Sequence, residues 1–182
     1  MLEKEFKQKI EEKILEFPLM QYEWITPHEL TFKEEVRQIC SQECPMYGKS
    51  WSCPPSVGTV EECRNRCRGY QGVFLFTTIA EVSDISNLEE TLQTRFDHEE
   101  ITRALGRIFL EEGAEVMLLS SESCAICESC AYCEGGECRH PEYMIPCIES
   151  QGILVTELAE KYEIPFLSSM TEVQWFGLIL YR

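Results

Sequence analysis

Basic residues are scarce in this chain. Its 182 residues include 16 lysines and arginines against 32 aspartates and glutamates, so the formal net charge is −16. Such a deficit argues against a nucleic-acid backbone or an anionic membrane surface as the main partner. We therefore expect neither a nucleic-acid nor a membrane partner. The acidic surface suits a solvated protein or one that docks to a basic patch on another protein.

Long apolar stretches are also missing. The longest apolar runs, at 72–79 and 175–181, are far too short to cross a bilayer. The charged segment at 1–6 has none of the apolar h-region of a signal peptide. These absences predict a cytoplasmic protein.

Common catalytic motifs are absent as well. The sequence contains no Walker A loop, no G-x-G-x-x-G, no HExxH and no convincing Ser/His/Asp set. Its three histidines, His28, His98 and His140, are scattered, and we expect His98 on the exposed side of a long helix. The pattern favours an electron carrier or accessory redox protein over a self-contained enzyme of these classes.

Cysteine, by contrast, is abundant. Five of the 11 cysteines fall within 40–67 and six within 124–147. A cytosolic compartment keeps thiols reduced, and an odd count leaves one thiol unpaired in any all-disulfide scheme. A chain of this length buries a core without cross-links. The cysteines therefore need another explanation, and metal ligation is the leading one.

The apolar pattern predicts a single α/β domain over 1–182. A buried strand, a long helix and a second buried strand follow one another, which favours parallel pairing. We expect a buried, mostly parallel sheet of about four strands, flanked by helices and carrying cysteine-rich inserts at 40–67 and 124–147. The expected helices lie at 3–17, 31–39, 60–67, 86–112 and 156–162, and the expected strands at 21–25, 72–79, 116–119 and 173–181.

The second insert gives the sharper metal signal. Cys124, Cys127 and Cys130 form C-x2-C-x2-C, and Cys133 extends the period. Bacterial ferredoxin sites combine this spacing with a more distant cysteine near proline, a role that Cys138 fits. Structural zinc is the alternative, although zinc sites usually show two separated C-x2-C pairs. Reduced structural thiols are a third interpretation.

The first insert is weaker alone. Cys40, Cys44 and Cys53 lie in or beside a proline-rich loop, and Cys63 and Cys67 share one face of the next helix. Cys63 is either the fourth thiolate of a second site or a buried small apolar residue, as free cysteine often is. For Cys67 we favour the buried interpretation.

These motifs together resemble the signatures of a family of predicted metal-binding proteins of unknown function, DUF2284. The resemblance rests on the stretch 40–55, on the second cysteine cluster with Arg139 and Pro141, and on 149–153. It implies metal binding through Cys40, Cys44, Cys53, Cys124, Cys127, Cys130 and Cys138. Cys133 and Cys147 depart from the family pattern, and at Cys147 a serine is expected.

The leading hypothesis is therefore an iron–sulfur protein with two 4Fe–4S clusters, acting in electron transfer with a redox partner protein. One alternative is an enzyme with an open iron site for substrate, and another is a zinc-stabilised interaction module. The proposed ligands are Cys40, Cys44, Cys53, Cys63, Cys124, Cys127, Cys130 and Cys138.

Local charge predicts an order for the two potentials. The stretch 34–68 holds five acidic and five basic residues, whereas 121–150 holds six acidic residues against Arg139 alone. Nearby carboxylates oppose reduction of a cluster. On this count the second cluster has the lower potential.

Overall fold

The structure is a computed structural model that describes residues 2–166 and 169–182. Within those residues, no helix combines the length and apolar character needed to cross a membrane. The helices are α1 (Leu2–Ile14), α2 (Glu34–Glu43), α3 (Val60–Arg68), α4 (Leu88–Glu111) and α5 (Val155–Lys161), with short 3-10 helices η1 (Pro27–Glu29), η2 (Ala131–Glu134) and η3 (Glu149–Gln151). The strands are β1 (Gln21–Ile25), β2 (Gly72–Glu81), β3 (Val116–Ser120) and β4 (Glu172–Tyr181).

The four strands form one sheet in the order β1-β2-β4-β3, and every neighbouring pair is antiparallel. The prediction of a mostly parallel sheet is therefore wrong. Strands β2 and β3, on either side of α4 in the chain, do run in the same direction, but β4 lies between them and pairs with both. Local strand–helix–strand order does not reveal that a later strand takes the central position.

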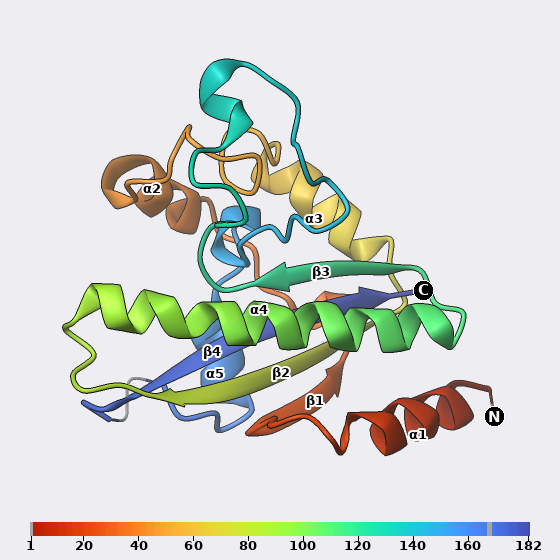
Figure 1. Cartoon of the computed structure of the whole chain (residues 1–182). Coiled ribbons are helices and arrows are strands. Elements are labelled where there is room, and N and C mark those ends of the chain that lie inside the picture. Colours follow the sequence, from red (N-terminus) through yellow and green to blue (C-terminus); the bar gives the residue numbers. More distant parts are fainter. Residues whose placement is uncertain (1, 167–168) are drawn as a thin grey trace.

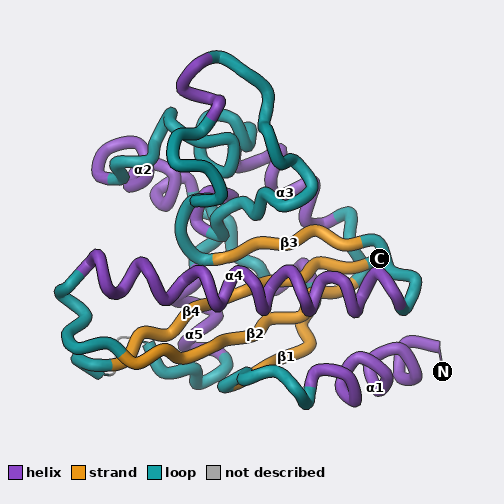
Figure 2. Tube along the Cα trace, viewed as in Figure 1, coloured by secondary structure: helices purple, strands orange, loops and turns teal. Residues whose placement is uncertain are grey.

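Strand β2 is buried on both faces, as its continuous apolar run predicts. Val73, Phe74, Leu75 and Phe76 are all fully buried. Because successive side chains of a strand point to opposite faces, Phe74 and Phe76 pack towards α1 and α4, and Val73 and Leu75 pack into the core beneath α3 and α5. The sheet thus separates two cores, with the long α4 across one face (Figure 2).

His98, on α4, faces this sheet and not the solvent. It is 1% exposed, its Nδ1 lies 2.8 Å from Thr78 Oγ1 and its Nε2 lies 3.0 Å from the Phe176 carbonyl oxygen. The expectation of an exposed His98 is wrong. The carbonyl only accepts, so Nε2 carries the proton and Nδ1 accepts from the threonine hydroxyl.

Both cysteine-rich inserts lie together on the side of the sheet that the edge strand β3 borders (Figure 1). The Cys124 amide donates to Ser52 Oγ at 2.9 Å, and the Trp51 indole donates to the Gly136 carbonyl at 3.1 Å. The Cys133 thiol donates to the Lys49 carbonyl at 3.3 Å. Segments about seventy to ninety residues apart in the chain are thereby joined, so the two inserts contact each other.

Candidate metal centre

The first cavity, of about 310 Å³, is lined by four cysteines, Cys40, Cys44, Cys53 and Cys147. Helix α2 begins at Glu34 and runs past the expected end at 39 to Glu43, so Cys40 lies inside the helix and Cys44 directly follows it. The spacing of four residues places these two thiols on one face. Cys53 comes from the following proline-rich loop and Cys147 from the end of the second insert.

Cys147 is held in this cavity by backbone contacts. It forms a parallel bridge with Ser120 at the end of β3, and its amide donates to the Ser52 carbonyl at 3.4 Å. Its thiol donates to Glu149 Oε2 at 2.9 Å. Burial raises the pKa of Cys147 well above its usual value and raises the pKa of Glu149 as well, because burial disfavours the charged form of each group.

Two other thiols of the cavity are also less acidic than free cysteine. Burial raises the pKa of Cys53 to about 11, against an opposing hydrogen bond from the Ser52 hydroxyl. Burial is also the main cause of the raised pKa of Cys40. A bound cation is what would convert these thiols to thiolates at neutral pH, because metal binding displaces the thiol proton.

The second cavity is lined by the cysteines Cys124, Cys127, Cys130 and Cys138. It is narrow, with about 20 Å³ of interior space, and Trp51 and His140 close it together with the cysteines. All four thiols come from the single loop between β3 and the turn at 141–143, folded back on itself around η2.

Cys130 differs in its electrostatic setting from the buried thiols of the first cavity. Partial burial acts to raise its pKa, but hydrogen bonds from the backbone amides of Tyr132 and Trp51 and from the Ser50 hydroxyl outweigh it and lower the pKa. Such donors stabilise a thiolate. These donors favour a negatively charged sulfur at Cys130, whereas burial raises the pKa of Cys124 in the same cavity.

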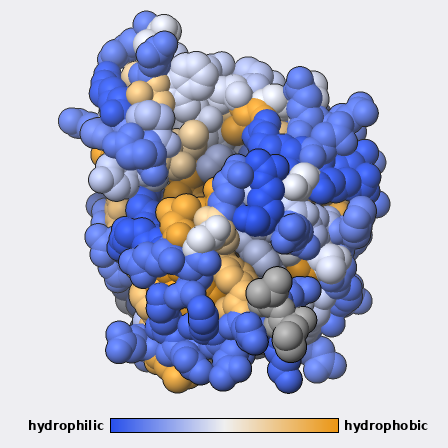
Figure 3. Space-filling view, turned by 90° about the vertical axis from the view of Figure 1, so that its right-hand side faces the viewer, coloured by the Kyte–Doolittle hydropathy of each residue, from blue (hydrophilic) through white to orange (hydrophobic). Residues whose placement is uncertain are grey.

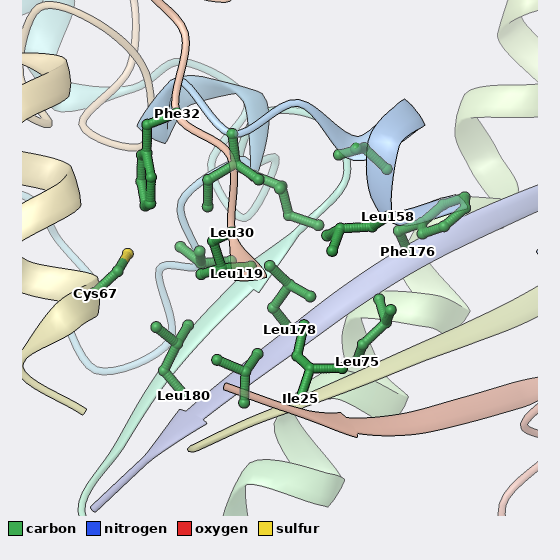
Figure 4. Close-up of a cluster of buried hydrophobic side chains, with 14 of the residues drawn as sticks. Ile25, Leu30, Phe32, Cys67, Leu75, Leu119, Leu158, Phe176, Leu178 and Leu180 are labelled. Carbon is green, nitrogen blue, oxygen red and sulfur yellow. The ribbon is translucent and has the colours of Figure 1, made fainter. Parts of the chain in front are cut away.

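Three cysteines line neither cavity. Cys63 is buried in α3, where its thiol donates to the Val57 carbonyl at 3.4 Å and lies 3.7 Å from Arg37 Nη2. Cys67 is fully buried in the core with Leu180 and Leu119 (Figure 4), and burial raises its pKa to about 12. The interpretation of Cys67 as a small core residue is thus confirmed. Cys133 is exposed.

The donor chemistry of both cavities fits a thiolate-bound group. Among residues 2–166 and 169–182, no three His, Cys, Asp or Glu side chains converge closely enough to hold one metal ion. The sulfurs instead line the walls of two cavities, four to each. Four thiols are the donor set of both iron–sulfur clusters and structural zinc, so the set itself admits either.

The carboxylates are distributed between the two cavities differently from what the charge count along the sequence predicts. Glu122 and Glu149, which the count assigns to the second site, line the first cavity, whereas the second cavity contains Arg139 among its lining residues. The count behind the predicted order of potentials therefore assigns two of its six carboxylates to the wrong cavity. The reason is that the chain around Glu122 and Glu149 passes beside Cys53 and Cys40, which are remote in sequence.

Sequence reasoning singled out Cys147 as an extra thiol but left it out of the proposed ligands, and it did not identify Glu149 or the serines Ser50 and Ser52 as residues of the site. Cys147 stands nine residues after Cys138, outside any repeat. Only its membership of the second cysteine cluster, together with the carboxylate two residues later, could have indicated it. The serines carry no spacing signal, because their contacts depend on how the two inserts meet.

Comparison with known proteins agrees with this donor set. The model of the family described as "Predicted metal-binding protein (DUF2284)" matches residues 23–181, and the chain belongs to this family. No curated protein and no solved structure matches the chain.

Proposed function

We propose that this member of the DUF2284 family binds two iron–sulfur clusters of the 4Fe–4S type and uses them for electron transfer with a redox partner protein. The observation that carries the proposal is the division of eight cysteines into two sets of four, each lining its own cavity. Cluster sites of this type use four cysteine thiolates. A single zinc ion would instead require four sulfurs each about 2.3 Å from one point.

The proposal assigns Cys124, Cys127, Cys130 and Cys138 to the second cluster, and Cys40, Cys44, Cys53 and Cys147 to the first. It takes Cys147 in place of Cys63 as the fourth ligand, because Cys147 lines the cavity with the other three and Cys63 does not. The C-x2-C-x2-C spacing of the second set supports the cluster interpretation independently.

The side chains of the protein would shield the clusters from water and set the charge around them. Bound clusters would supply one-electron chemistry. Trp51, which packs edge-on against Tyr132 with ring centroids 5.0 Å apart, limits water at the second cavity.

The net charge of −16 favours a partner that presents a basic surface. Hydrophilic side chains cover most of the face shown in Figure 3.

One observation favours an enzyme as the second candidate. The first cavity, at about 310 Å³, is in the range of small-molecule pockets and carries Glu122, Glu149 and Tyr47 beside its cysteines. If Cys147 stayed bonded to Glu149 and did not ligate, three thiols would remain and one iron would be open to a substrate.

Anaerobic purification followed by iron, zinc and acid-labile sulfide analysis tests the proposal. Two cubane clusters predict on the order of 8 iron and 8 sulfide per chain. Stoichiometric zinc without sulfide would refute the iron–sulfur proposal and leave the zinc-stabilised module. Iron and sulfide for both clusters, with a first cluster whose spectrum changes on adding small ligands such as cyanide, would favour the enzyme.

A further inference from the structure

A surface groove of about 560 Å³ adjoins the second candidate cluster site. Residues of α4 line it together with Ile126 and Tyr143 of the second insert. Ile126 stands between Cys124 and Cys127 in the chain, and it lines the second cavity as well. The side chain of Ile126 is therefore a wall that the groove shares with the cavity of the second site.

The position of Tyr143 beside α4 is held by Arg103. The Arg103 Nε donates to the Tyr143 carbonyl at 3.1 Å, and Arg103 Nη2 pairs with Glu99 Oε2 at 2.8 Å. Glu99 is 3% exposed, so the ion pair is anchored in the interior. The side chains of Tyr143 and Ile126 remain 52% and 37% exposed. The groove thus presents two apolar side chains to the solvent on an anchored support.

The α4 side of the groove is close to neutral. Its two guanidinium groups belong to Arg103, which pairs with Glu99, and to Arg107. Glu100 lies two turns before Arg107 on the same face of the helix and also lines the groove. An excess of charge therefore has to come from the insert side.

Exposed carboxylates flank the two apolar residues of the insert in the chain. Glu128 follows Ile126 by two residues, and Glu142 directly precedes Tyr143. Both glutamates are exposed, and neither lines either cysteine cavity. An apolar centre with negative charge beside it is complementary to a partner that presents basic side chains around an apolar patch.

The first insert has no comparable excess of charge. It holds five acidic and five basic residues over 34–68. Of the six acidic residues of 121–150, two, Glu122 and Glu149, line the first cavity, which leaves four in the second insert beside Arg139. Charge complementarity therefore selects the second insert for a basic partner.

We propose that the redox partner docks on this groove, over Ile126 and Tyr143, through a basic surface with an apolar centre. The partner is a one-electron redox protein, and the step moves one electron between the second cluster and the redox centre of the partner without making or breaking a bond. The inference rests on the proposed function and adds the site and the face at which the partner binds.

Stopped-flow reduction of cytochrome c by the dithionite-reduced protein, freed of excess reductant, tests this docking. Cytochrome c is the probe because it is a basic protein that accepts one electron. The double variant Glu128→Lys/Glu142→Lys should lower the second-order rate constant at least tenfold at low ionic strength, since electrostatic steering changes association rates by about 10–10³. Added salt should shrink the difference, because the screening length falls to about 3 Å at 1 M.

The apolar centre is tested by Tyr143→Ser. This variant removes an exposed aromatic side chain of the groove and changes no charge. Its rate constant with cytochrome c should fall at high salt as well as at low salt, because the lost contact is not electrostatic. An unchanged rate constant at both salt concentrations would remove the apolar centre from the docking site.

Two controls separate docking from damage to the cluster. Glu43→Lys/Glu61→Lys makes the same change of charge at exposed residues of the first insert that line neither cavity, and it should retain most of the wild-type rate constant. Substoichiometric ferricyanide, a small anionic one-electron acceptor, should react with Glu128→Lys/Glu142→Lys at least as fast as with the wild type. The quantity to compare is therefore the rate constant with cytochrome c divided by that with ferricyanide.

An unchanged ratio in Glu128→Lys/Glu142→Lys, or an equal fall in Glu43→Lys/Glu61→Lys, would overturn the docking site while iron and sulfide analysis still upheld the clusters. Protein that holds zinc and no sulfide, or clusters that reduce neither acceptor, would overturn the proposed function and the docking site together.

Discussion

The thiol of Cys147 donates a hydrogen bond to the carboxylate of Glu149 at 2.9 Å, inside a cavity that three other cysteines line. The contact joins Cys147 to an acid only two residues away. It places a potential ligand and a negative charge at the same site, and each can be tested separately.

Replacing Cys147 should remove the first cluster. Cys147→Ser is expected to lose about half of the iron and sulfide, because one of the two four-thiolate sites would lack a ligand. Cys63→Ser is the matched control, since Cys63 is a cysteine of the first insert that lines neither cavity, and it should keep its full iron content. If Cys63→Ser lost half of the iron and Cys147→Ser kept all of it, Cys63 would be the fourth ligand.

Replacing Glu149 should raise the potential of the first cluster. Glu149→Gln removes a carboxylate from the wall of the first cavity beside Cys147, so reduction becomes easier. The exposed Glu137, which lines neither cavity, gives the control Glu137→Gln. Redox titration should show a shift only in the Glu149 variant.

The charged residues that line the two cavities predict the opposite order of potentials to the one expected from the sequence. Because Glu122 and Glu149 line the first cavity and Arg139 lines the second, the first cluster should be the one with the lower potential. EPR-monitored titration of the wild type and of Cys127→Ser checks this: the signal that survives in the variant should be the lower-potential one. Survival of the higher-potential signal would contradict the charge argument.

Stability should depend on pH through His98. Burial lowers its pKa to about 4, against the weaker opposing effect of its bond to the Phe176 carbonyl. The unfolded chain binds this proton near pH 6.5 and the folded chain does not, so stability is lost as the pH falls below about 6.5. The expected loss between about pH 7 and pH 5 is roughly 2 kcal/mol.

Urea unfolding of the wild type and of His98→Gln measures this dependence. The variant should be less stable at neutral pH, because Thr78 and the Phe176 carbonyl lose a well-placed partner, and its stability should change less between the two pH values. His28→Gln, at an exposed histidine, should retain the wild-type slope. Identical slopes for all three proteins would mean that His98 is not the group responsible.

Gly177 should resist substitution because it lies opposite Phe76 in the β2–β4 pair. A Cβ at this position would stand 2.2 Å from the Phe76 ring, so Gly177→Ala should cost about 1–3 kcal/mol. Adding Phe76→Leu should recover part of that loss, and a double-mutant cycle of unfolding free energies would reveal the coupling. Additive effects would show that the ring moves aside freely.

Sequence reasoning succeeded for features that are fixed by interactions within one segment of the chain. The buried run of β2, the length of α4 and the C-x2-C-x2-C loop are local features, and the structure places the elements close to their expected positions. Hydrophobic periodicity and cysteine spacing are properties of one segment, so they can be recognised in a single sequence.

The errors concern contacts between distant segments. The place of β4 between β2 and β3 was not predictable from the order of strands, and neither was the approach of Cys147 to Cys53. The prediction that His98 is exposed was wrong for the same reason, since its polar partners come from β2 and β4. Counting charges along the chain misplaced Glu122 and Glu149 because neighbours in sequence belong to different cavities.

The central position of β4 has a consequence for synthesis on the ribosome. Both cysteine-rich inserts, together with β2, α4 and β3, leave the ribosome before residues 172–181 are available to join β2 to β3. At translation speeds of about 5–20 residues per second, the thiols of the second insert wait several seconds for the strand that completes the sheet. During that interval neither insert rests on a completed sheet, so the cysteines remain free thiols on an unfinished scaffold until residues 172–181 join β2 to β3.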